Sequence, residues 1–450
     1  MSVVASRLAR LIQAATLLAL GLAGAAAQGT NDAPHPIDLP TALRLAGARN
    51  LEVQIAQQRL SEARAQRESA REQFLPALSL GVAYRRRDGM AQAVPAGTVS
   101  DTHLQSYAPG ATLAAQVALG DAIYQSLAAR QLVTASEHAL EAQRQDATLS
   151  AAQGYFDLAK AAALAGVLRE AVKVSEDYQG QLHEAVAAGV AFKGDELRVQ
   201  TQTGTYQHAL RQGLEQQRIH AVNLAQVLHL DPALELVPAP DELAPLKLFG
   251  VETGLDALVQ RALSSRPELK QSQALVQAAR QANKGAVYGP LVPSLNAQVF
   301  AGGFGGGRDN GPSNFGDAED YQLGLSWRLG PGGLFDSGRV HAARARLAAA
   351  ELGETKLKDT IASQVVAALT RLRSLSDQMA LARRNVATAS EALRLTRDRK
   401  QYGVGVVLED IQAQQELTRA RATHVTSIAE FNKAQYALSR AVGEAADAPR

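Results

Sequence analysis

The sequence predicts an α+β membrane protein in which short strands build a transmembrane β-barrel and very long helices continue from it as a tube. Three observations support this fold class. The chain begins with a segment of the kind that directs export, one pattern of elements occurs twice, and short alternating segments stand beside long stretches without proline. Helical stretches of that length are typical of a coiled coil or a helical tube rather than a compact domain.

The N-terminus has the pattern of a secretory signal peptide. A short basic start with Arg7 and Arg10 precedes an apolar run from Leu11 to Leu22, and small residues follow up to Ala27. We expect cleavage after Ala27. The alternative is a membrane anchor, but the apolar run is shorter than the roughly 20 residues of a spanning helix.

The composition excludes several classes of function. The chain has 46 Lys and Arg, 44 Asp and Glu, and no cysteine. Removal of residues 1–27 leaves 44 residues of each sign, so we expect no nucleic-acid partner. The lack of cysteine rules out disulfides, thiolate metal sites, a cysteine nucleophile and a lipidated N-terminal cysteine.

Three landmarks occur twice in the same order, which indicates an internal duplication. The first two pairs are offset by 217 residues and the third by 214. The pairs are Leu75-Pro76 with Val292-Pro293, Arg49-Asn50-Leu51 with Arg266-Pro267-Glu268-Leu269, and Gly189 followed by Asp195 with Gly403 followed by Glu409.

The duplication predicts the domain organisation. A first structural repeat, with a helix, two strands and a long helical hairpin, is expected after the signal peptide, and a second after a proline-rich connector. The predicted boundaries are 1–27 for the signal peptide, 28–230 for the first repeat, 231–252 for the connector, 253–443 for the second repeat and 444–450 for a C-terminal tail.

Each repeat is expected to contain two kinds of helix. A helical segment opens it, at 41–74 and again at 254–288, and both segments end near prolines. The proline-free stretches 110–231 and 332–448 follow. In the first of these, alanines and aromatic residues recur at steps of three and four, so a helix over Asp121–Ala187 runs for about 100 Å.

Four short segments alternate between apolar and small or polar residues, as a membrane barrel strand requires. They are 77–85, 112–119, 295–301 and 321–329. A half-buried soluble sheet has the same period and remains the alternative. The residues predicted to face lipid are Leu78, Leu80, Val82, Leu323, Leu325 and Trp327.

Four strands cannot close a membrane barrel, since the smallest closed ones have about eight strands. The chain is therefore expected to oligomerise. Two copies give eight strands, and three give twelve, which is wide enough to leave a passage.

No segment carries the pattern of an active site, and we expect no catalytic residues, no cofactor and no metal ion. His183-Glu184 begins like a zinc-protease motif but lacks the second histidine. The glycine-rich Gly302–Gly307 lacks the Lys-Ser/Thr of a phosphate-binding loop, and we expect it to be an extracellular loop between two strands.

Taken together, these features resemble the TolC-like outer-membrane efflux family over about Leu39 to Gly443. The doubled landmarks carry the resemblance, with Leu334-Phe335-Asp336-Ser337-Gly338 after the last strand. In the first repeat, Leu119-Gly120-Asp121-Ala122 stands where the family pattern has Phe-Asp-x-Gly, so the joint between strand and helix departs from that pattern.

The resemblance implies a homotrimer that shares a twelve-stranded barrel in the outer membrane of a Gram-negative bacterium. It also implies a twelve-helix periplasmic tunnel, contact with outer-membrane lipid, a periplasmic adaptor (membrane fusion) protein and an inner-membrane pump of RND or ABC type. The function is then the channel of a tripartite efflux or type I secretion system, which exports small molecules or polypeptides passively. The alternative is a periplasmic coiled-coil adaptor or envelope scaffold, which has no use for apolar strand faces.

The turns at Gly189 and Gly403 are predicted to be periplasmic tips that contact the adaptor. Apolar neighbours, Val190 and Val404 among them, favour contact, although a turn of this kind needs no partner.

A gate is predicted close to these tips, where charged and aromatic residues gather. Arg399 and Tyr402 are expected to bond the acids Glu409, Asp410 or Asp195, within or between protomers, and to hold the pore shut. The alternative is that these charges only solvate a hairpin end.

Overall fold

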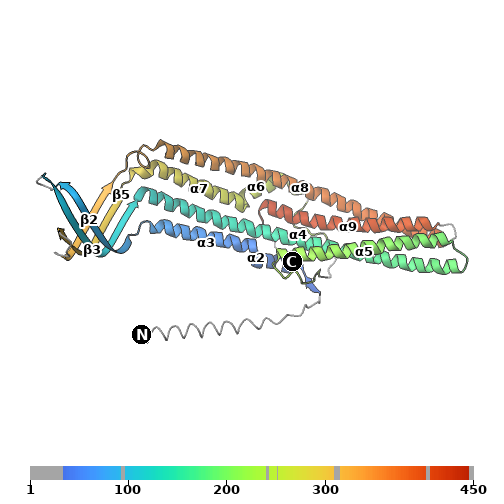
Figure 1. The fold of residues 1–450 in the computed structure, drawn as a ribbon. Helices are drawn as coiled ribbons and strands as arrows, with labels where there is room; N and C mark the ends of the chain where they lie inside the picture. Colours follow the sequence, from blue (N-terminus) through green and yellow to red (C-terminus); the bar gives the residue numbers. More distant parts are fainter. Residues whose placement is uncertain are drawn as a thin grey trace, which may run out of the picture.

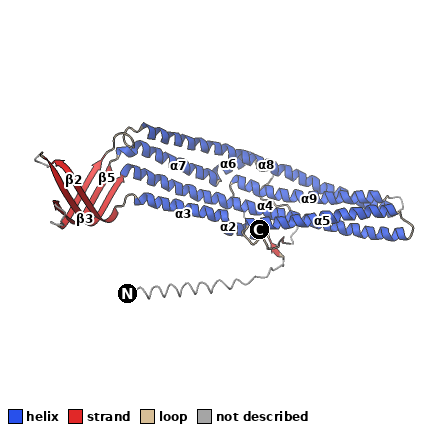
Figure 2. Cartoon of the chain, viewed as in Figure 1, coloured by secondary structure: helices blue, strands red, loops and turns tan. Residues whose placement is uncertain are grey.

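A computed structural model describes residues 34–92, 97–239, 243–250, 252–308, 315–401 and 406–444. The chain is long and narrow, with a β-sheet at one end and helical hairpins at the other (Figures 1 and 2). The expected signal peptide, most of the expected C-terminal tail, and Tyr402, Gly403 and Val404 lie outside the described residues.

The same order of elements occurs twice: two short helices, two strands, one very long helix and one shorter helix. The first set is α2 (Leu39–Arg49), α3 (Leu51–Glu72), β2 (Ala77–Gln92), β3 (Val99–Ala118), α4 (Leu119–Ala187) and α5 (Lys193–Val227). The second set is α6 (Leu255–Ser265), α7 (Pro267–Tyr288), the 3₁₀ turn η1 (Gly289–Leu291), β5 (Ser294–Arg308), β6 (Gly316–Ser326), α8 (Ser337–Gln401) and α9 (Val407–Val442).

The opening helical segments are each broken in two, so the prediction of one continuous helix in each was wrong. Asn50 has an extended backbone, and its side chain accepts hydrogen bonds from the backbone N–H groups of Glu52 and Val53 at 2.9 and 3.4 Å. It therefore caps a new helix. In the second repeat Arg266 precedes Pro267, and a residue before proline is driven out of the helical region.

The long helices match the predicted lengths. α4 has 69 residues and α8 has 65, which correspond to about 100 Å each. Each folds back as a hairpin with the shorter helix after it, and α4 also packs on α3, α7 and α9. The buried apolar residues lie between these helices, and the largest include Leu158, Leu224, Leu228, Ile361, Leu369, Leu372 and Leu438.

The four long strands form one antiparallel sheet in the order β2-β3-β5-β6. Two predictions about it need correction. Gly302–Gly307 is part of β5, not a loop; a Cβ at Gly303 would lie 2.2 Å from the Phe315 ring, so no side chain fits at that position. Trp327 lies one residue beyond β6, where its indole N–H donates to the carbonyl of Leu291 at 3.2 Å.

The structure at the joint between β3 and α4 explains the unusual sequence Leu119-Gly120-Asp121-Ala122 found there. A Cβ at Gly120 would lie 2.1 Å from the carbonyl oxygen of Gly289, so only glycine fits where α4 crosses η1. The next residue, Asp121, forms an ion pair with Arg339 at the start of α8, and Arg339 also donates to the carbonyl of Gly285 at 3.2 Å. The two strand-to-helix joints are thereby tied to each other.

The connector between the two sets is bound along the middle of the molecule. Its short strand β4 (Leu236–Pro238) pairs in parallel with β1 (His35–Ile37). Further along, the buried amide of Asn432 on α9 accepts from the backbone N–H of Leu246 at 2.8 Å, and Gln435 accepts from Phe249 at 2.8 Å.

Candidate functional site

One face of the sheet is apolar and exposed. The strand registers place Leu78, Leu113, Val299 and Tyr321 in one row across all four strands. The strand residues predicted to face lipid, namely Leu78, Leu80, Val82, Leu323 and Leu325, are 59 to 79% exposed in the single chain. We call this surface the apolar face; its contact with lipid remains a prediction.

The opposite surface, here called the small-residue face, carries short or polar side chains. Across the same strands it includes Ser79, Gly81, Thr112, Gln298, Gln322 and Gly324. The outermost strands β2 and β6 each have a neighbour on one side only within the described chain. The sheet is therefore open at both edges.

The first helical tip is a tight turn with exposed apolar residues. Gly189 has a φ of +75°, a left-handed conformation that glycine adopts readily, and the N–H of Val190 donates to the carbonyl of Ala185 at 2.9 Å. Val190 is 79% and Phe192 is 72% exposed. The second tip, with Gly403 and Val404, lies outside the described residues.

Glu196 joins the two helices behind the first tip. It is almost fully buried, and its carboxylate lies 2.6 Å from Lys193 Nζ and 2.9 Å from His183 Nδ1. The hydrogen bond from Lys193, and then that from His183, lowers the pKa of this carboxyl. Neither periodicity nor a motif indicated the contact with His183, because that residue lies on the other side of the turn.

The structure brings some of the predicted gate residues together and separates others. Arg399 Nη1 lies 3.3 Å from Glu409 Oε2, an exposed pair that links α8 to α9 within one chain. Asp410 is buried, and its Oδ1 lies 3.6 Å from the Nε of Arg397 rather than near Arg399. Asp195 pairs with Arg198 of its own helix at 3.0 Å.

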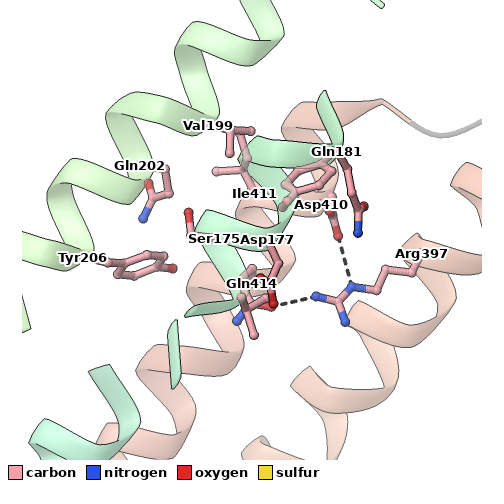
Figure 3. Close-up of a pocket in the computed structure, with 12 residues that line it drawn as sticks. Ser175, Asp177, Gln181, Val199, Gln202, Tyr206, Arg397, Asp410, Ile411 and Gln414 are labelled. Carbon is pink, nitrogen blue, oxygen red and sulfur yellow. Dashed lines mark hydrogen bonds and ion pairs between the residues drawn. The ribbon is translucent and has the colours of Figure 1, made fainter. Parts of the chain in front are cut away.

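A cavity of about 550 Å³ lies beside these pairs, between α4, α5, α8 and α9. Figure 3 shows Arg397 reaching both Asp410 and Gln414, whose Oε1 accepts from the guanidinium at 3.2 Å. Tyr178 also lines it, and burial together with the charges of Asp410 and Asp195 raises the pKa of its hydroxyl. The cavity therefore lies between the two hairpins and is lined by polar groups from both.

Two further findings concern the part of the chain that the structure describes. No helix in it carries an apolar stretch long enough to span a membrane. Its histidines and acids form no group of three or more that is placed to hold a metal ion.

The sequence matches a model of the outer membrane efflux protein family over residues 42–228 and 258–444. The first segment lies within the first predicted repeat, and the second begins within the second predicted repeat and ends one residue beyond it. The sequence is also 26% identical to Protein CyaE of Bordetella pertussis over 388 residues. This aligned region covers 83% of this chain and 77% of that protein.

Solved structures share the fold. The Campylobacter jejuni CmeC outer membrane channel superposes with a TM-score of 0.76 at 17% identity, over 90% of this chain and 85% of that one. The Vibrio cholerae outer membrane protein VceC superposes with a TM-score of 0.75 at 19% identity, over 90% of this chain and 96% of that one. At these identities the likeness concerns the fold alone.

Proposed function

We propose that this chain, which belongs to the outer membrane efflux protein family, is the channel component of a tripartite efflux or type I secretion system. Its location is the outer membrane of a Gram-negative bacterium, and its helices form the periplasmic tunnel. The family is one of transport proteins rather than enzymes. We further propose how the chains assemble, where the channel closes and which proteins it contacts.

The open four-stranded sheet is the observation that carries the proposal. One face is apolar and exposed, the other is lined by small residues, and both outer strands have a free edge. Strand edges left open within lipid cost several kcal/mol for each unsatisfied group, so the sheet must be completed by other chains. Three copies complete it as a twelve-stranded barrel that encloses a passage.

The helices fit the same assembly. Next to the sheet, α3, α4, α7 and α8 lie side by side, and near the tips α4, α5, α8 and α9 do (Figure 1). Each chain thus contributes four helices at either level. A trimer has twelve at both, which suits a tunnel of constant width continuing from the barrel.

The resting tunnel is proposed to be closed near the tips by polar contacts, including the pair between Arg399 and Glu409. An exposed pair of this kind contributes only about 0.2 to 1 kcal/mol, so it breaks without unfolding the tunnel. The exposed apolar residues at the tip, Val190 and Phe192, are proposed to contact a periplasmic adaptor, and through it an inner-membrane pump of RND or ABC type.

The alternative of a periplasmic adaptor or envelope scaffold is not supported by the family match, which covers both halves of the chain. Expression with the N-terminal segment, followed by membrane fractionation and electrophoresis with and without heating, tests the proposal. A channel subunit sediments with the outer membrane and migrates as a trimer that boiling converts to monomer. A monomer in the soluble periplasmic fraction would contradict the proposal.

A further inference from the structure

Three consecutive arginines lie in β2 beyond its apolar stretch. Because side chains alternate along a strand, Arg85 and Arg87 share the small-residue face with Ser79 and Gly81. Arg86 shares the apolar face with Leu80. The unbroken one-to-one register between β2 and β3 preserves this alternation over the whole strand.

Arg85 and Arg87 line a hollow of about 490 Å³ on the small-residue face. The other residues around it are Leu104, Gln105, Ser106, Phe304, Gly306 and Gly307. Gly306 of β5 is aligned with Arg85 through Ser106, whereas Arg308 is aligned with Arg87 through Leu104. The hollow is thus bordered by two guanidinium groups and, apart from Gln105 and Ser106, by apolar or glycine residues.

The two arginines are not neutralised within the part of the chain that the structure describes. Neither forms an ion pair or hydrogen bond there, whereas Arg86 on the other face lies 2.7 Å from Asp88. The acids of the strands mostly lie on the apolar face with Asp88. They are Asp88, Asp101, Asp317 and Glu319.

The one strand acid on the small-residue face is distant from the arginines. Asp320 is aligned through Phe300 and Thr112 with Ser79, which is six residues from Arg85 along β2. At about 3.3 Å per residue this separation is roughly 20 Å, more than twice the screening length at physiological salt. Its charge therefore leaves the positive potential at the hollow largely intact.

We propose that Arg85 and Arg87 form an anion-binding site inside the channel, near its outer mouth, for solutes that carry carboxylate or phosphate groups. The inference rests on the proposed function, because only a closed trimer turns the small-residue face toward a lumen. Two arginines from each of three chains then place six guanidinium groups around the passage. Their planar donors suit carboxylate and phosphate oxygens, and rings of arginine are a known means of selecting anions.

The site is tested by ion selectivity in planar bilayers under a KCl gradient. Arg85→Gln combined with Arg87→Gln is expected to lower the chloride-to-potassium permeability ratio by about twofold or more, because the focused positive potential is lost. Arg86→Gln is the matched control, on the same strand but on the apolar face, and is expected to keep the parent ratio. Trimer yield on unheated gels verifies that each variant assembles.

A second measurement on the parent protein does not depend on any variant. Inorganic tripolyphosphate added on the barrel side is expected to reduce the current, and its block should weaken as salt is raised. Conducting channels whose selectivity is unchanged in the double variant, or is changed equally by Arg86→Gln, would overturn this inference alone. A parent protein that forms no channel would overturn the proposed function, and the anion site with it.

Discussion

Glu268 and Arg440 together fasten three helices. Glu268 is the second residue of α7, and its carboxylate accepts from Arg266 at 2.9 Å and from Arg440 near the end of α9. Arg440 also lies 2.7 Å from Asp146 on α4. Burial alone raises the pKa of Glu268, but the hydrogen bonds from Arg440 and Arg266 outweigh it and hold the pKa at about 2.

The stability that this carboxylate contributes is therefore expected to be lost in acid. The folded pKa of about 2 lies below the ordinary 4.5, so the contribution is complete above pH 4.5 and is lost as the pH falls toward 2. Glu268→Gln should lower the free energy of unfolding at pH 7 by roughly 2 kcal/mol, because two buried guanidinium groups lose a charged partner. Urea unfolding of the parent and the variant in detergent, at pH 7 and at pH 3, measures this difference in the free energy of unfolding.

The control for this prediction is Glu137→Gln. Glu137 forms an exposed pair with Arg64 at 3.3 Å, and removal of such a pair should change stability by less than about 1 kcal/mol. Equal losses in the two variants would mean that the Glu268 cluster contributes no more than a surface pair.

The proposed gate is tested at the same scale. Arg399→Ala with Tyr402→Phe should raise single-channel conductance or open probability, because the pair with Glu409 is removed from the tip. Arg198→Ala, which breaks a pair within α5, serves as the control and should conduct like the parent. Parent-level conductance and open probability in the double variant would place the gate elsewhere.

At the scale of the elements, hydrophobic alternation located all four strands but not their ends. It marks only the part of a strand that is apolar on one face, whereas backbone pairing continues through polar and glycine residues such as Arg85–Gln92 and Gly302–Gly307. The same limit applies to the helices. Helical periodicity continues on both sides of Asn50 and Arg266. The pattern of apolar residues therefore does not show that one helix ends and another begins at these residues.

The two faces of β6 offer a matched pair of substitutions. Leu325→Arg places a charge on the apolar face and should impair trimer assembly, because arginine on the lipid side of a barrel costs up to roughly 2 to 4 kcal/mol at the midplane and less toward the end of a strand, where Leu325 lies. Ser326→Arg lies one residue further on the opposite face. This variant gives up one exposed hydrogen bond, which the Asn296 amide donates to the Ser326 hydroxyl, and should assemble, as seen on unheated gels.

Equal assembly of both β6 variants would remove the lipid-facing assignment. Failure of both would instead indicate that this end of the strand tolerates no long side chain.

At the scale of the whole molecule, the repeat offset predicts an internal duplication, and the same order of elements occurs twice in the described chain, but the offset gives no indication of what joins the halves. The connector is held by Asn432 and Gln435, two amides spaced by three residues on α9. Such a spacing is common in any helix, and nothing local distinguishes these amides from solvated ones. The gate remains a prediction. Charge density near a turn is visible in the sequence, whereas the pairing of Arg397 with Asp410 depends on how α8 packs on α9.

The adaptor contact is a prediction about the assembled envelope complex. A photo-crosslinker at Val190, and another at Val404, should capture a periplasmic adaptor protein that mass spectrometry identifies, because the exposed apolar residues of the first tip favour a partner. A crosslinker at Leu352 of α8, which is 71% exposed but far along the helix from the tips, is the control. Tips that capture no envelope protein beyond their own trimer would count against the contact.

In the proposed barrel, the free edges of β2 and β6 make each chain one segment of a ring whose joints are head-to-tail. Such a joint gives a ring of three only when each segment turns the next by a third of a revolution; another whole fraction gives a ring of another size, and a rotation that does not close gives an open filament. Closure therefore constrains the curvature of the sheet as well as the pairing of its strands. A substitution that flattens the sheet without weakening any strand pair would yield larger rings or polymers rather than less trimer.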